Sequence, residues 1–182
     1  MTAPSNINLD RRQFSLAGLL SAGLAFAGPA RAIEGAAYDV SPWQGATSGW
    51  TLIDTTGKSW SVNDTAGRAV LINFWASWCQ PCRAEMPSLQ QLADQHGSDK
   101  LLVLAVNFKE PASRALQFAS QAGIRLPVLL DIDGKAARAW GVNIFPTTLT
   151  IDSRGKPRRR IRGELDWSSG DARKLVAELF VS

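Results

Sequence analysis

Residues 70–82 read Val-Leu-Ile-Asn-Phe-Trp-Ala-Ser-Trp-Cys-Gln-Pro-Cys, an apolar run that leads into two cysteines separated by two residues. The first six residues are apolar apart from Asn73 and include β-branched and aromatic side chains, as in a strand covered on both faces. A helical pattern begins at Gln80, so the cysteines fall at the start of a helix. The stretch therefore predicts a central strand, a short loop and a helix that opens with a cysteine pair.

The cysteine pair is the centre of the predicted chemistry. Cys79 and Cys82 are the only cysteines in 182 residues, which leaves no second thiolate pair for a structural metal site. Side chains at i and i+3 share one face of a helix and are near enough to form a disulfide. The free N–H groups at the helix start favour the thiolate of Cys79, and Cys82 can then resolve a mixed disulfide. Pro81 suits the first helical turn, where no hydrogen bond is lost.

Strand and helix patterns alternate along the rest of the chain. Strands are expected at 50–53, 58–62, 70–75, 101–106, 128–130, 147–151 and 158–162, and helices at 80–96, 112–122, 135–140 and 168–181. Residues 33–49 lack a sustained period and are expected to form a linker or an irregular N-terminal arm. Residues 50–182 are therefore predicted to form one α/β domain with a central mixed sheet flanked by helices. The alternating arginines of 158–162 are expected to protect an edge strand.

The first 32 residues have the order of an export signal. Arg11 and Arg12 precede a Phe-x-Leu step, a weakly apolar stretch and small residues that end at Ala32. This order resembles the twin-arginine signal of bacteria, and it predicts cleavage after Ala32 and a periplasmic protein. The alternative is an uncleaved anchor in the inner membrane, although the uncharged run 13–30 contains three glycines, a proline and a glutamine.

Charge and histidine content argue against two other classes of protein. The formal net charge of +4 is spread over 20 basic and 16 acidic residues without a long basic helix, so no nucleic-acid partner is expected. His96 is the single histidine, and on one helix it would lie about 21 Å from Cys82, far outside metal-ligand range. No metal site is therefore predicted.

Residues 74–87 read Phe-Trp-Ala-Ser-Trp-Cys-Gln-Pro-Cys-Arg-Ala-Glu-Met-Pro and resemble the active-site signature of the thioredoxin superfamily, specifically its exported TlpA/ResA/DsbE-like branch. The resemblance continues at residues 145–147, Phe-Pro-Thr, and covers roughly residue 50 to the C-terminus. It implies a thioredoxin-like fold with a βα insertion at 112–130, ahead of the cis-proline strand. It also implies thiol-disulfide oxidoreductase activity, with a redox-active disulfide and no other cofactor.

The resemblance implies roles for individual residues. Cys79 is then the nucleophile, Cys82 the resolving thiol and Pro146 the cis-proline that packs opposite them. The backbone of Phe145 would pair with an extended substrate segment. The other expected substrate contacts are Trp78, Gln80 and Pro81.

Glu85 is the third expected catalytic residue. It follows Cys82 by three residues and resembles the glutamate that this branch carries there. Asn73, which cannot titrate near neutral pH, occupies the position of thioredoxin's buried aspartate. A partly buried Glu85 would have a raised pKa and would accept the Cys82 proton instead. By position alone, Glu85 is equally well a solvated residue near a helix N-terminus.

The sequence therefore predicts a monomeric extracytoplasmic enzyme that reduces or exchanges disulfides in partner proteins. Its expected partners are cysteine-containing extracytoplasmic proteins. The resemblance makes apocytochrome c a candidate substrate, as in cytochrome c maturation, and a membrane thiol-reducing transporter the electron source. A net oxidant is an alternative that differs in redox potential and not in residues. A peroxidase of peroxiredoxin type and a thioredoxin-fold metallochaperone are competing hypotheses.

Overall fold

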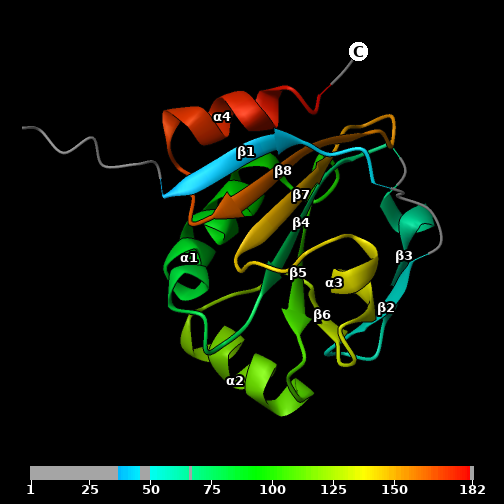
Figure 1. The fold of residues 1–182 in the computed structure, drawn as a ribbon, viewed down its shortest axis with the longest axis vertical. Coiled ribbons are helices and arrows are strands. Elements are labelled where there is room, and N and C mark those ends of the chain that lie inside the picture. Colours follow the sequence, from blue (N-terminus) through cyan, green and yellow to red (C-terminus); the bar gives the residue numbers. More distant parts are fainter. Residues whose placement is uncertain (1–36, 46–49, 66, 181–182) are drawn as a thin grey trace, which may run out of the picture. The chain divides into compact units, whose positions relative to one another are not determined.

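Eight strands form one mixed sheet within residues 37–45, 50–65 and 67–180, the part of the chain that the computed structural model describes (Figure 1). The strand order is β1-β8-β7-β4-β5-β6-β2-β3. The strands are β1 (Tyr38–Pro42), β2 (Thr51–Asp54), β3 (Ser59–Ser61), β4 (Ala69–Trp75), β5 (Leu101–Phe108), β6 (Val128–Asp131), β7 (Thr147–Ile151) and β8 (Pro157–Gly163). The predicted export signal lies outside the described residues.

The helices connect and cover the strands. They are η1 (Val62–Thr65), α1 (Gln80–His96), α2 (Ala112–Gln121), α3 (Lys135–Ala139) and α4 (Gly170–Ala177). The predicted bounds of α1 are confirmed. Helix α4 is shorter than the predicted helix 168–181: it begins at Gly170, because Ser169 caps it by accepting a hydrogen bond from the N–H of Ala172, and it ends at Ala177. β4 runs parallel to β5 and antiparallel to β7, which confirms the predicted mixed α/β sheet.

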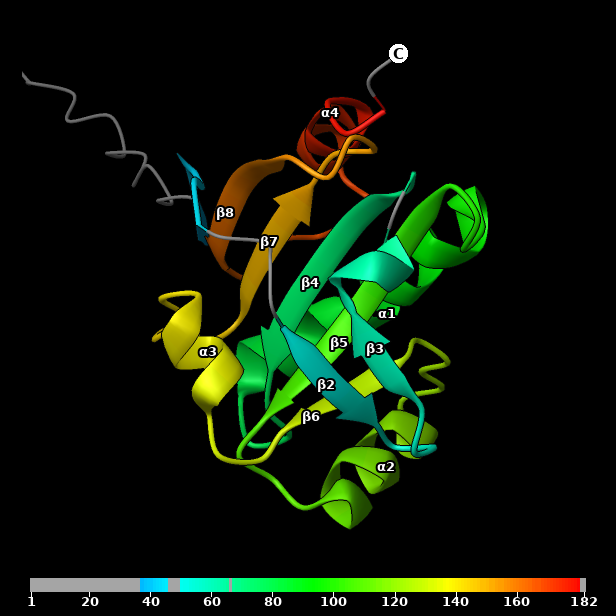
Figure 2. The same ribbon diagram turned by 90° about the vertical axis from the view of Figure 1, so that its right-hand side faces the viewer.

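Different helices cover the two faces of the sheet. Leu71 of β4 packs in a cluster with α1, α2 and α4, whereas its neighbours Val70 and Ile72 pack in a second cluster with α3. Figures 1 and 2 show α1 and α3 on opposite sides of β4. Strand β4 is buried along its whole length. Its nearly continuous apolar sequence is therefore explained by burial on both faces.

Strand β1 was not predicted, and it changes the role of β8. β1 pairs antiparallel with β8, in a register that places Tyr38 opposite Gly163 and Pro42 opposite Arg159. The prediction that β8 is an edge strand is therefore wrong, since β8 lies between β1 and β7. Arginines of β8 instead make specific contacts within the protein: Arg160 donates to the carbonyl of Trp140 at 2.8 Å, Arg162 lies 3.8 Å from Asp39, and their neighbour Arg159 pairs with Glu178 at 2.9 Å.

Gly163 is the last residue of β8 and pairs with Tyr38, the first residue of β1. It adopts a φ of 94°, in the region that favours glycine. Its N–H donates to the carbonyl of Pro146 at 2.9 Å. A Cβ at this position would collide with the backbone carbonyl oxygen of Ala37. The residue therefore lies where β1 and the segment around Pro146 meet.

We expect Gly163→Ala to lower the free energy of unfolding by about 3–4 kcal/mol, through left-handed strain together with a backbone clash. Gly155→Ala is the matched control, because Gly155 also has a positive φ, 79°, but a Cβ there would meet open space, with no atom within 4 Å. The control should lose about 1–2 kcal/mol. Urea unfolding measures both variants, and equal losses would contradict the predicted clash with Ala37.

Candidate active site

Cys79 and Cys82 form a disulfide at the amino end of α1, with their Cα atoms 5.3 Å apart. Cys79 is the N-cap residue, and Cys82 lies in the first turn. Cys79 is 6% exposed, whereas Cys82 is fully buried. Only Cys79 is therefore accessible to an incoming protein.

The helix start also stabilises negative charge on Cys79. The backbone N–H of Cys82 donates to Sγ of Cys79 at 3.2 Å. Pro81 lies in the first turn and removes no helical hydrogen bond. After reduction, the same N–H and the positive end of the helix dipole favour the thiolate. The helix start thus stabilises the thiolate of Cys79, which keeps some exposure, whereas Cys82 is fully buried.

An aromatic surface borders the disulfide on the side of the Pro146 loop. The peptide bond between Phe145 and Pro146 is cis, the geometry that the resemblance implied. Trp78 is 64% exposed, and its ring meets that of Phe145 edge-on at 6.0 Å. Phe145 in turn packs against Phe108 at 4.7 Å. Gln80 is exposed beside Cys79. The ring contact of Trp78 with Phe145 therefore joins the loop before α1 to the segment before β7.

Glu85 lies in the interior, so the alternative of a solvated glutamate does not hold. It is 2% exposed, and its two oxygens accept hydrogen bonds from Nδ2 of Asn73 at 2.6 Å and the N–H of Leu165 at 3.2 Å. Burial raises the pKa of Glu85 to about 8, although the hydrogen bonds from Leu165 and Asn73 favour the carboxylate. Asn73 also donates to Oγ1 of Thr148 at 3.0 Å. A protonatable group therefore stands one helical turn beyond Cys82.

Glu110, which no sequence motif singles out, fixes the loop before Cys79. It is 4% exposed, and its carboxylate accepts from the N–H of Ser77 at 2.7 Å, from its hydroxyl at 2.6 Å and from Nδ2 of Asn107 at 2.7 Å. The preceding Lys109 has a φ of 54°, a left-handed turn that directs the chain out of β5. Ser77 and Glu110 are 33 residues apart, so no sequence spacing relates them.

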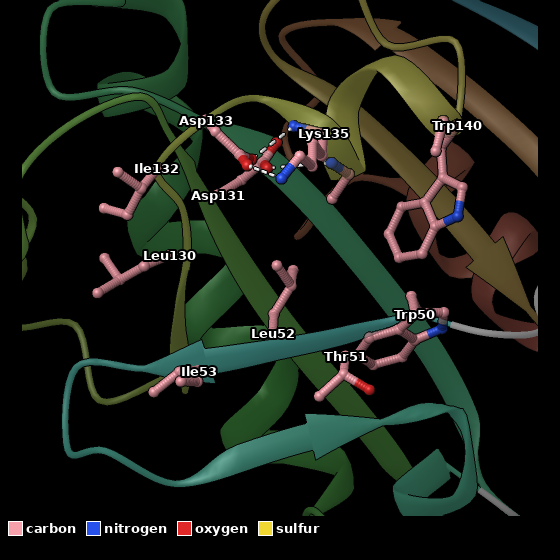
Figure 3. Close-up of a pocket in the computed structure, with 12 residues that line it drawn as sticks. Trp50, Thr51, Leu52, Ile53, Leu130, Asp131, Ile132, Asp133, Lys135 and Trp140 are labelled. Atoms are coloured by element: carbon pink, nitrogen blue, oxygen red, sulfur yellow. Dashed lines mark hydrogen bonds and ion pairs between the residues drawn. The ribbon is translucent and has the colours of Figure 1, made fainter.

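A cavity of about 670 Å³ lies between β2, β6 and α3, and neither cysteine lines it (Figure 3). Its wall includes Trp50 and Trp140, whose rings meet edge-on at 5.6 Å. Its acidic groups are already bonded: Asp131 accepts from two N–H groups of α3, and Asp133 pairs with Lys135 at 2.6 Å. The lining thus offers no unpaired carboxylate for catalysis.

A metal site takes several ligands close together, and a membrane-spanning helix must be long and apolar. In residues 37–45, 50–65 and 67–180, no group of three or more His, Cys, Asp or Glu side chains is placed to hold a metal ion. Within the same ranges, no helix has the length and apolar character needed to cross a membrane.

Comparison with known proteins relates the chain to thiol-disulfide chemistry. The profile of the AhpC/TSA family matches residues 45–159. The thiol-disulfide oxidoreductase ResA of Geobacillus thermodenitrificans is 34% identical over 116 residues, which cover 64% of this chain and 67% of the relative.

Solved structures show the same fold. A DsbF homologue from Corynebacterium diphtheriae has a TM-score of 0.68 at 26% identity, over 81% of this chain and 96% of that one. The exposed lipoprotein thioredoxin of Streptococcus pneumoniae has a TM-score of 0.60 at 32% identity, over 71% of this chain and 98% of that one. These similarities confirm the predicted thioredoxin-like fold.

Proposed function

Because the chain belongs to the AhpC/TSA family, in the ResA-like branch of the thioredoxin superfamily, we propose that its Cys79–Cys82 pair exchanges disulfides with cysteine-containing proteins outside the cytoplasm. The observation that carries the proposal is the disulfide at the start of α1, of which one sulfur is accessible and the other buried. The similarity to a thiol-disulfide oxidoreductase supports the same type of reaction for this chain. We also propose a role for each residue of the site.

The reaction starts from the reduced enzyme. The Cys79 thiolate attacks one sulfur of a target disulfide, which releases the other target sulfur as a thiolate and forms a mixed disulfide. Cys82 then loses its proton and attacks Sγ of Cys79, which re-forms the enzyme disulfide and releases the second target sulfur. The target gains two electrons and the enzyme loses two. A thiol-reducing transporter in the membrane returns them.

Glu85 is proposed to take the Cys82 proton. It follows Cys82 by one turn of α1, and its pKa of about 8 is close to that of an ordinary thiol, about 8.5. Proton transfer between two groups of similar pKa costs little free energy. The deprotonated carboxylate would be stabilised by the hydrogen bonds from Asn73 and Leu165.

The substrate is proposed to lie against the aromatic surface. Trp78, Gln80 and Pro81 would contact it from the α1 side, and the backbone of Phe145, next to Pro146, would pair with it as an added strand. The exposed ring of Trp78 supports this role, since amphipathic aromatic side chains are frequent anchors at interfaces.

Location and partners are proposed from the sequence. The Arg11-Arg12 pattern supports export through a twin-arginine signal, with cleavage after Ala32 or retention as an anchor. Apocytochrome c, whose haem-binding motif contains two cysteines, is the proposed substrate, and the enzyme is proposed to act as a monomer.

The test is a purified exchange reaction. The reduced protein should open the disulfide of a model peptide in one turnover, and a Cys82→Ala variant should stop at a mixed disulfide that mass spectrometry detects. A redox potential near that of thioredoxin, about −270 mV, supports a reductase, whereas one near about −120 mV supports a net oxidant. Absence of peptide exchange, together with rapid peroxide consumption or tight copper binding, would replace the proposal with a peroxidase or a metallochaperone.

A further inference from the structure

A groove between α1 and α2 opens beside the reactive disulfide. Two adjoining cavities of about 310 and 170 Å³ share Arg83, Phe118 and Gln121 in their lining. One reaches Gln80 and the other Ser77, the residues one after and two before Cys79. Together these two cavities form the α1–α2 groove. A chain that occupies it contacts residues that lie on both sides of Cys79 in the sequence.

The groove carries two cationic side chains without carboxylate partners. Arg83 of α1 and Arg114 of α2 are exposed, and in the part of the chain that the structure describes no acidic side chain lies within 4.0 Å of either guanidinium. Other arginines are paired: Arg125 meets Asp94 at 2.6 Å, for example. The charge of the groove is therefore free to bind an external anion.

The nearest acidic residues along the chain form no ion pair with Arg83 or Arg114 in the part of the chain that the structure describes. Glu110 is buried, and its oxygens already accept hydrogen bonds from Ser77 and Asn107. Glu85 is also buried, on the core side of α1. The amino end of α1 adds a partial positive charge at the same groove. The charged side chains that line the two cavities are therefore both arginines.

Phe118 gives both cavities of the groove an aromatic surface. Phe118 is 9% exposed and packs against Trp75 at 5.0 Å, while the guanidinium of Arg83 lies 5.6 Å from the Phe118 ring centroid. Gln117 and Gln121 line the sides and offer amide donors and acceptors to a peptide backbone. An aromatic ring, two amide side chains and two guanidinium groups together suit a polypeptide with acidic side chains.

We propose that the α1–α2 groove binds an acidic segment next to the target's cysteines, so that the enzyme selects protein disulfides flanked by Asp or Glu. The inference rests on the proposed exchange function and specifies its substrate. Arg83 follows Cys79 by four residues of helix, about 6 Å of axial rise, which an extended chain spans in about two residues. The preferred acidic residues therefore lie one to three positions from the attacked cysteine.

The test compares matched disulfide peptides. Each contains one Cys-Ala-Ala-Cys disulfide, flanked on one side by two aspartates, two asparagines or two lysines, and reacts with the reduced full-length protein in a stopped-flow fluorimeter. The measured quantity is the ratio of the aspartate to the asparagine rate constant, which is compared between protein variants so that differences in intrinsic peptide reactivity cancel. We expect a ratio of about five to ten at roughly 0.01 M salt, falling towards one at roughly 1 M.

Variants separate the groove from general charge. Arg114→Glu should invert the preference in favour of the lysine peptide, and Arg83→Gln should lower the ratio several-fold. Arg154→Gln, the control, removes the same charge from the β7–β8 turn at the other end of β7 from Pro146, and it should keep the wild-type ratio.

Each outcome decides between distinct conclusions. If Arg154→Gln lowers the rate ratio as much as Arg83→Gln does, the preference arises from the net charge of the protein and the inference is overturned. If the rate of oxidised glutathione reduction depends on Arg114 while the peptide rates do not, the groove binds a small thiol compound, and the inference is overturned as well. Equal rates for all peptides would refute the inference but leave the proposed function, whereas no exchange with any peptide would refute the function itself.

Discussion

Cys79→Ser is expected to lower the rate of insulin reduction with dithiothreitol by at least about 10³-fold, to the uncatalysed rate. The serine hydroxyl is not ionised at neutral pH and cannot attack a disulfide. Cys79 is also the one residue of the pair that keeps any exposure, so Cys82 cannot replace it. Turbidity from the precipitating insulin chains measures the rate.

Cys82→Ser is the matched comparison, because it removes the same kind of atom three residues away. This variant should still form the mixed disulfide, but it lacks the thiol that releases the target, so the mixed disulfide should persist until dithiothreitol cleaves it. Both variants should keep the helical circular dichroism of the wild type, since serine and cysteine are similar in size. Activity retained by Cys79→Ser in a folded protein would contradict the assignment of the nucleophile.

The stability of the oxidised protein is expected to fall by about 5 kcal/mol as the pH rises from about 4.5 to 8. The cause is Glu85, whose pKa is raised from 4.5 to about 8 by burial. Between these values the folded protein holds a proton that the unfolded chain has released, so each step up in pH favours unfolding. Below about 4.5 both states are protonated and above about 8 both are ionised, so the contribution of Glu85 is then constant.

Other groups act outside this pH window. The carboxyl groups of Asp54, Asp64, Asp133, Asp166 and Asp171 have lowered pKa values, so their contributions to stability are complete above about pH 4. Tyr38 has a raised pKa and titrates above about pH 10. Urea unfolding in steps from pH 5 to 8, compared between the wild type and a Glu85 variant, therefore measures the contribution of Glu85.

Glu85→Gln should remove this slope and be several kcal/mol more stable than the wild type at pH 8. The amide can be accommodated, because its oxygen can accept from Leu165 while its NH₂ group donates to Asn73, whose amide turns over. Oδ1 of Asn73, which has no partner among the described residues, is then the acceptor. Glu164→Gln is the control and should keep most of the slope, since Glu164 is partly exposed and its charge is the smallest of the causes that set the pKa of Glu85. A wild type without a slope would show that Glu85 is ionised when buried.

The parts of the fold that the sequence predicts are those that local pattern determines. The apolar run of β4 and the helical pattern from Gln80 follow from burial on both faces and from apolar spacing, so the predicted bounds of both elements agree with the observed ones within one residue. The pairing of Cys79 with Cys82 is predictable for the same reason, since their relation is one turn of helix. Residues near each other in the chain are thus the predictable part of the site.

Features that depend on distant pairing were not predictable. β1 has the sequence Tyr-Asp-Val-Ser-Pro, an alternation of only five residues within a segment rich in glycine, alanine and serine, and it is a strand because β8 offers it hydrogen bonds. Glu110 likewise carries no motif, and its place beside Ser77 is set by the parallel pairing of β4 with β5. The burial of Glu85 also needed the structure, since Leu165, which donates to it, is 80 residues away.

The carboxylate of Glu110 has a consequence for how docking and reactivity are linked. Glu110 lies two residues before the start of α2, a helix that lines the proposed binding groove. Its carboxylate accepts a hydrogen bond from the backbone N–H of Ser77, two residues before Cys79. The start of the helix that lines the proposed groove and the loop that carries the nucleophile are therefore tied together through the side chain of one residue.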